Sequence, residues 1–158
     1  MDDLNKIIPL STRRLVALVT FSFLLTFVVS RLVVYLVLGH LLPDFFLTVK
    51  GVHIHHFTYG VVILVVVGFY LLIFRPHSDS QALWNAAFVY GVGLGLTFDE
   101  FGMWVMLRDD YWVRQSYDAI IIITLFFLNI LLFPTLKSII TKEFRRLWRI
   151  VKKISKKD

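Results

Sequence analysis

Cysteine is absent from this chain of 158 residues. Without thiols the protein can form no disulfide, no thiolate zinc site and no cysteine-ligated cluster. Any bound metal ion would therefore be held by nitrogen and oxygen ligands. The sequence also lacks an HExxH motif, the ExxH pairs of di-iron bundles and a nucleophile elbow. The usual motif signatures of zinc proteases, di-iron proteins and serine hydrolases are therefore missing.

Hydrophobic residues are abundant instead. They make up 58% of the chain, and the mean hydropathy is +0.74. Ordinary soluble domains contain roughly 45–50% apolar residues. A chain of this composition is solvated by lipid, and its length supplies only a few spans of about 20 residues each. We therefore expect one all-α integral membrane domain that crosses the bilayer several times.

Four hydrophobic runs predict transmembrane helices, because lipid leaves no partner for open backbone groups. The first run is too long for the apolar core of a cleavable signal peptide and lacks a small-residue cleavage site, so we expect it to be retained. Residues 1–140 then form the transmembrane domain, and residues 141–158 form a basic tail. The predicted spans are residues 15–38, 57–74, 82–107 and 119–140.

Lys and Arg are distributed unevenly about these spans. The N-terminal segment, the loop at Arg75 and the C-terminal tail fall on one side and hold thirteen basic residues. The other side holds Lys50, Arg108 and Arg114. The positive-inside rule then predicts a plasma membrane protein with both termini in the cytoplasm.

A histidine cluster stands at the start of the second span. His53, His55 and His56 are three of the five histidines of the chain. In an extended segment His53 and His55 share a face, whereas in a helix His53 and His56 are neighbours. Neutral imidazole is the commonest metal ligand. The alternative is an interfacial role with polar tips in the headgroup region.

The third span carries adjacent carboxylates, Asp99 and Glu100. Gly91 and Gly95 form a small-xxx-small pair that favours close helix contact in lipid. Asp99 follows at the same four-residue spacing, so it lies on the same helix face and points into the bundle. Glu100 is turned by about 100° and can reach a different partner. A carboxylate at mid-bilayer costs about 2.5–3.5 kcal/mol on insertion scales, so each one needs compensation.

Three compensations are open, namely metal binding, ion pairing and protonation of a carboxylate. His53, His55 and His56 together with Asp99 or Glu100 could hold a divalent transition metal, namely zinc, iron or manganese, while the other carboxylate acts as a catalytic base. Alternatively, Arg31 in the first span could pair with one carboxylate without any metal.

The outer loop supplies further polar residues. Arg108 and Arg114, with Arg31, are candidates to bind an anionic substrate group, and Asp118 could face the histidines. We also expect Ser116 to cap the fourth helix.

The C-terminal tail predicts a basic amphipathic helix. Its apolar residues recur at spacings of four and three, so we expect it to lie on anionic lipid at the inner membrane surface or to pack against another chain. These residues are Ile140, Phe144, Leu147, Val151 and Ile154. Beside a membrane span, so basic a tail is not an indication of nucleic-acid binding.

Three functions follow from this sequence. The first is a metal-dependent hydrolase whose outward-facing site acts on a lipid or lipid-linked substrate. The second is an ion- or proton-coupled transporter or sensor, which would require a homo-oligomer because four helices are few for a pathway. The third is a non-catalytic accessory subunit that uses its polar residues to hold helices together.

Overall fold

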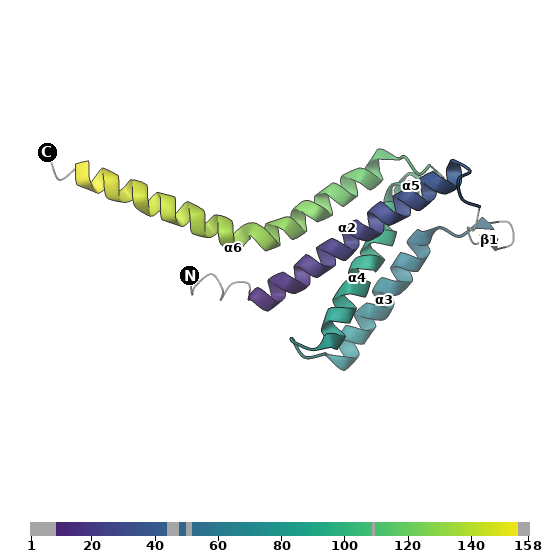
Figure 1. The fold of residues 1–158 in the computed structure, drawn as a ribbon, viewed down its shortest axis with the longest axis horizontal. Coiled ribbons are helices and arrows are strands. Elements are labelled where there is room, and N and C mark those ends of the chain that lie inside the picture. The colour runs from purple at the N-terminus through teal and green to yellow at the C-terminus, as the bar shows by residue number, and fades with distance from the viewer. Residues whose placement is uncertain (1–8, 44–47, 50–51, 109, 155–158) are drawn as a thin grey trace.

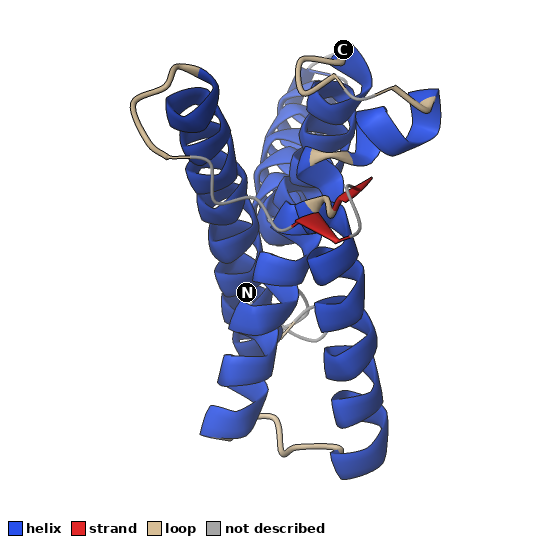
Figure 2. Cartoon of the chain, turned by 90° about the vertical axis from the view of Figure 1, so that its right-hand side faces the viewer, coloured by secondary structure: helices blue, strands red, loops and turns tan. Residues whose placement is uncertain are grey.

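The computed structural model describes residues 9–43, 48–49, 52–108 and 110–154 (Figure 1). A hairpin of two-residue strands precedes α3, with β1 (Thr48–Val49) antiparallel to β2 (Val52–His53). All other regular elements are helices, as Figure 2 shows, so the all-α fold class is confirmed for the described residues. The helices are α2 (Leu10–Leu38), α3 (His56–Phe74), α4 (Gln81–Asp99), α5 (Phe101–Met106) and α6 (Arg114–Ile154).

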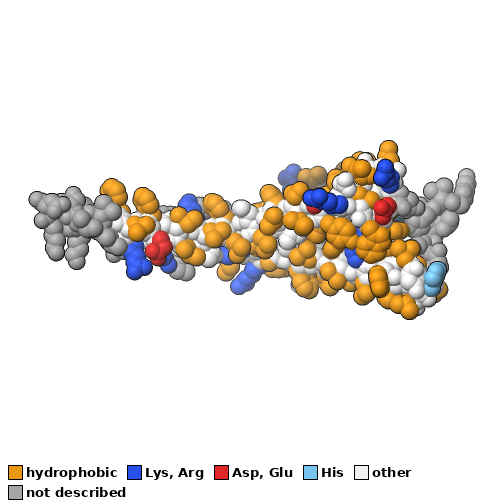
Figure 3. Space-filling model, turned by 90° about the horizontal axis from the view of Figure 1, so that it is seen from above, with side chains coloured by type: hydrophobic (Ala, Val, Ile, Leu, Met, Phe, Trp, Pro, Cys, Tyr) orange, Lys and Arg blue, Asp and Glu red, His pale blue; other side chains and the backbone are white. Residues whose placement is uncertain are grey.

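Within the described part of the chain, three helical segments are long and apolar enough to cross a membrane. They are α2, α3 and residues Arg114–Phe133 of α6. Their apolar side chains are largely directed outward, and hydrophobic groups dominate the visible face of the bundle in Figure 3. An exposed hydrophobic surface around a small buried core is the pattern that lipid stabilises. The chain is therefore a helical membrane protein.

The predicted third span, residues 82–107, is not one continuous helix. It breaks at Glu100 into α4 and the short α5, and α4 is not among the three apolar spans. The sequence-based prediction of an unbroken helix was therefore wrong at this point. The hydrophobic pattern runs through the break, but polar contacts from other helices stabilise the interruption.

Helix α4 lies between α2 and α3 (Figure 1). Gly91 and Gly95 face α2, where a side chain added at either position would collide with the α2 backbone. A Cβ atom at Gly91 would lie 2.6 Å from the carbonyl oxygen of Val19, and one at Gly95 would lie 2.9 Å from that of Phe23. The small residues thus allow the two helices to approach closely, as the sequence pattern predicts.

The opposite face of α4 packs on α3. A Cβ atom at Gly60 of α3 would lie 2.6 Å from the backbone nitrogen of Thr97, and one at Gly93 would lie 2.9 Å from Ile63. The hydroxyl of Thr97 donates to the carbonyl of Gly93 at 2.8 Å, so this buried polar group is satisfied within its own helix. Close contact on both faces holds the C-terminal end of α4 in a fixed position between its neighbours.

Helix α6 runs antiparallel to α2. The ring of Phe23 meets that of Phe127 edge-on, and Phe27 meets Tyr117 in the same way one turn further along α2. Helix α6 begins at Arg114 and continues through Pro134 to Ile154, so the predicted boundary at residue 140 falls inside one helix. Figure 1 shows that α6 bends and that its C-terminal part, drawn in yellow, leads away from the bundle.

Alanine substitutions at two glycines test the close contact between α2 and α4. Gly91→Ala should lower the free energy of unfolding by about 1–3 kcal/mol, the usual cost of overpacking a tight contact. Gly68→Ala is the matched control in α3, because no atom lies within 4 Å of a Cβ at that position. Unfolding by denaturing detergent, followed by circular dichroism, measures both. Equal stability of the two variants would contradict the packing described.

Candidate functional site

The unusual polar residues of three helices meet at one end of the bundle. Arg31 comes from the C-terminal third of α2, His56 from the first turn of α3, and the Asp99–Glu100 pair from the break between α4 and α5. Asp99 is 0% exposed and Glu100 is 1% exposed. Two carboxylates buried so completely need donors or cations beside them.

Arg31 supplies the main compensation for Asp99. Its Nε atom donates to Oδ1 of Asp99 in a buried ion pair. One terminal nitrogen donates to the backbone carbonyl of Asp99, and the other donates to the backbone carbonyl of Tyr111 in the loop before α6. A guanidinium group presents several donors in a fixed plane, which suits three acceptors from two segments.

Aromatic rings surround the same guanidinium group. Its carbon lies 5.0 Å from the ring centroid of Tyr117, 5.6 Å from that of Phe27 and 5.8 Å from that of Trp112. Cations are attracted to aromatic faces at such distances, more strongly where water is excluded. Arg31 therefore joins α2, the end of α4 and the start of α6 through charge, hydrogen bonds and ring contacts together.

His56 lies between the two carboxylates. Its Nε2 atom is 2.7 Å from Oδ2 of Asp99, and its Nδ1 atom is 3.3 Å from Oε1 of Glu100. His55 approaches the same Oε1 atom, at 3.1 Å from its Nδ1. The pair that meets the carboxylates is thus His55 and His56. The chain is extended at His55 and becomes helical at His56. The histidine segment is therefore neither wholly extended nor wholly helical, the two conformations considered from the sequence.

Arg31 offsets one of the two buried carboxylate charges through its ion pair with Asp99. The imidazoles of His55 and His56 contact the oxygens of Asp99 and Glu100 that Arg31 leaves. Pairing of this kind lowers the cost of placing ionised groups in a medium of low dielectric constant.

Glu100 also completes the start of α3. Helix α3 has no side-chain cap of its own at His55. Instead, Oε2 of Glu100 accepts a hydrogen bond of 2.8 Å from the backbone nitrogen of Phe57, in the first turn. Unpaired N–H groups and the positive end of the dipole make a helix start a favourable place for a carboxylate. Glu100 is therefore a structural cap as well as a partner of His55.

Ser116 caps the start of α5 in a similar way. Sequence reasoning gave this residue the cap of the fourth helix, but it lies inside α6 and is fully buried. Its hydroxyl accepts a hydrogen bond of 2.9 Å from the backbone nitrogen of Gly102, two residues beyond the break. No pattern in the sequence links Ser116 to Gly102, so this contact could not be predicted.

The predicted metal ligands that the structure describes, His55, His56 and Asp99, are paired with other side chains. Among the described residues, no group of three or more His, Asp or Glu side chains could hold a metal ion. The carboxylate oxygens of Asp99 and Glu100 already accept from Arg31, His56, His55 and the Phe57 backbone. The side chain of His53, the remaining predicted ligand, lies outside the described part of the structure. The metal site therefore stays a prediction.

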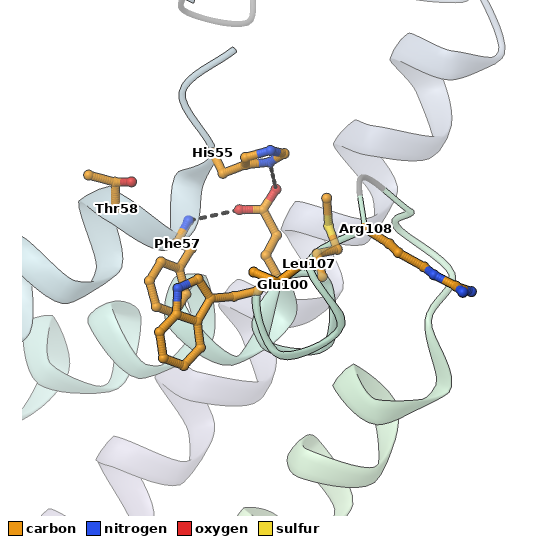
Figure 4. Close-up of a pocket in the computed structure, with 8 residues that line it drawn as sticks. His55, Phe57, Thr58, Glu100, Leu107 and Arg108 are labelled. Carbon is orange, nitrogen blue, oxygen red and sulfur yellow. Dashed lines mark hydrogen bonds and ion pairs between the residues drawn. The ribbon is translucent and has the colours of Figure 1, made fainter. Parts of the chain in front are cut away.

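A pocket of about 390 Å³ opens beside the His55–Glu100 pair (Figure 4). Figure 4 shows the imidazole of His55 above the Glu100 carboxylate, with Phe57 on one side and Leu107 on the other. Phe57 stacks on Trp104 at 5.6 Å between ring centroids. The remaining lining residues are Thr58, Met103 and Arg108, and the Arg108 side chain extends away from Glu100 in this view.

Two predicted substrate residues lie apart from the pocket. Arg114 pairs with Asp118 at 3.3 Å across one turn of α6, with side chains 87% and 48% exposed. An ion pair so exposed is a surface feature and contributes little to stability. Of the four residues predicted to bind substrate, Arg31 belongs to the buried cluster and Arg108 lines the pocket.

Comparisons with protein families, with curated proteins and with solved structures found no match to this chain.

Removal of the Arg31 side-chain charge tests the buried ion pair. Arg31→Gln should destabilise the protein by about 3–5 kcal/mol, because Asp99 is left as an uncompensated buried charge. The double variant Arg31→Gln/Asp99→Asn should lose less stability than the sum of the two single variants. Denaturing-detergent titrations of the four proteins measure this coupling.

The exposed pair of Arg114 and Asp118 provides the control for that cycle. Arg114→Gln should change the free energy of unfolding by less than about 1 kcal/mol. Additive losses from the Arg31 and Asp99 variants would show that the two side chains do not interact in the folded protein.

Proposed function

We propose that this protein is a membrane hydrolase that acts on a lipid or lipid-linked substrate, with His55 as its acid–base residue and Glu100 as the carboxylate that orients it. The observation that carries the proposal is the position of this pair at the edge of a mainly apolar pocket of about 390 Å³. Pockets of this size with apolar walls and a few polar groups are typical of small-molecule sites.

The walls of the pocket suit an amphiphile. Phe57, Met103, Trp104 and Leu107 offer apolar surface, whereas His55 and Glu100 are polar. Trp104 is 60% exposed and Leu107 is 88% exposed, so the pocket lies at a surface that meets the bilayer. A lipid-like molecule could bury its chain against the rings and bring its polar linkage to the histidine.

The hydrogen bond between His55 and Glu100 orients the imidazole and selects its tautomer. When Nδ1–H of His55 donates to the carboxylate, the lone pair of the neutral ring is on Nε2. A base of this kind removes a proton from an attacking water, and the buried carboxylate stabilises the imidazolium that forms. The water then attacks the carbonyl or phosphoryl centre of the substrate, and the imidazolium returns the proton to the leaving group.

The distribution of Lys and Arg supports one orientation of the site. With both termini in the cytoplasm of a plasma membrane protein, the cluster faces the outer leaflet, at the end of the bundle opposite Arg13 and Arg14. Four crossings, with α4 and α5 together as the third, would give this topology. Helix α4 is sheltered between α2 and α3, which reduces the apolar surface it needs.

A structural role is the second candidate function. Asp99 and Glu100 have protein partners on each carboxylate oxygen, and Glu100 caps α3. Polar residues so fully paired can act as interhelical connections in an accessory subunit.

Vesicle hydrolysis assays distinguish these candidates. Purified protein in vesicles containing ester-linked phospholipids should release a cleaved product that mass spectrometry detects. His55→Ala should lower turnover by about 10²–10⁴-fold, the usual contribution of a general base. His77→Ala, at an exposed histidine between α3 and α4, should leave turnover unchanged.

A further variant separates catalysis from folding. Thr58→Trp should fill the pocket and lower turnover while the unfolding transition stays in place, because Thr58 is exposed on the pocket wall. Absence of product from wild-type protein, with destabilisation by His55→Ala or Glu100→Gln, would favour the structural role. One transition-metal ion per chain that disappears in His55→Ala would instead favour the metal-dependent hydrolase.

A further inference from the structure

The part of α6 beyond Pro134 differs in character from the part before it. Residues Arg114–Phe133 form the membrane-spanning segment. About 20 helical residues cover the 30 Å of a bilayer core, so the chain leaves the hydrocarbon near Pro134. A proline inside a helix removes one backbone hydrogen bond and bends the helix. Figure 1 shows that α6 bends and that its C-terminal part turns away from the bundle. We call residues 134–154 the C-terminal arm.

Exposed apolar side chains of the C-terminal arm lie on one face of the helix. Ile140 and Phe144 are each 67% exposed, and Leu147 and Trp148 are 59% and 62% exposed. Nothing in the described part of the chain covers them. Apolar surface of this extent on a helix is normally buried against a partner or a membrane.

Basic side chains accompany this apolar face. Between residues 134 and 154 the sequence has seven Lys and Arg against the single acidic residue Glu143. Glu143 is itself 3.7 Å from Arg146 within the helix. Figure 3 shows basic and hydrophobic groups next to one another along the arm.

We propose that the C-terminal arm lies flat on an anionic lipid surface, with its apolar face in the headgroup–acyl boundary. The emergence of the span at Pro134 brings the arm to the membrane surface, and the bend turns it along that surface. Lys and Arg beside the apolar face then contact lipid phosphates, while Phe144 and Trp148 enter the boundary region. The anionic surface is the leaflet on the side of Arg13 and Arg14, because α2 and α6 are antiparallel.

Charge argues against a second copy of the arm as the occupant. The 4-3 spacing of its apolar residues would also suit a coiled coil. In a self-paired arm the apolar residues would form the seam, and Lys142, Arg145 and Arg146 would lie on the outer positions of each helix without an anionic partner. An anionic lipid surface instead offers contacts both to the apolar face and to the basic side chains next to it.

The absence of native cysteine makes a direct test available. A single Phe144→Cys substitution in the full chain, labelled with an environment-sensitive fluorophore, reports on the apolar face. An Arg146→Cys label, two residues away and on the other side of the helix, is the matched control. Both proteins are reconstituted in bilayers of phosphatidylcholine alone or mixed with phosphatidylglycerol.

We expect the Phe144→Cys label to shift to the blue and to become protected from a neutral aqueous quencher in the anionic bilayer only. High salt should reverse the protection, since the Debye length falls to about 3 Å at 1 M. The control label should stay accessible throughout. Accessibility of the Phe144→Cys label in all bilayers would overturn the proposal, and protection that rises with protein density in neutral bilayers would show a second copy as the occupant.

Discussion

The contact between Arg31 and Asp99 is the interaction on which the site depends. It unites a guanidinium group with a fully buried carboxylate and with the backbone carbonyl at the end of α4. The remaining donor nitrogen of Arg31 binds the backbone carbonyl of Tyr111 in the loop before α6. Burying an unpaired carboxylate costs free energy. The bundle can therefore bury Asp99 only when the Arg31 side chain of α2 lies next to it. The glycines of α4 make that possible because they bring the two helices into backbone contact.

The break between α4 and α5 illustrates how a membrane protein can interrupt a helix. Every freed backbone group needs a partner where water is scarce. Arg31 satisfies the Asp99 carbonyl, and Ser116 satisfies the Gly102 N–H. Both partners belong to other helices. The interruption turns Glu100 away from the row of Asp99 and toward α3, where it meets His55 and the start of that helix.

Much of this arrangement could be predicted from local sequence patterns. The Gly91–Gly95 row indicated the face on which Asp99 meets Arg31, and helical geometry indicated that Glu100 would find another partner. The position of the break could not be predicted, because hydrophobic residues continue through it and its stabilising partners are remote. Ser116 and Gly102 are 14 residues apart in the sequence and belong to different elements. The pairing of His55 and His56 with the two carboxylates was equally unpredictable, since it depends on the change from extended chain to helix at His56.

The cap that Glu100 provides for α3 has a consequence for the order of assembly. The residue that pairs with the first turn of α3 lies 43 positions later in the chain than Phe57. Because a chain enters the membrane from its N-terminal side, α3 is made before its cap exists. The first turn of α3, with His55 and His56, reaches its final form only when the end of α4 arrives. The contacts between the histidines and the carboxylates therefore require that the end of α4 has docked against α3.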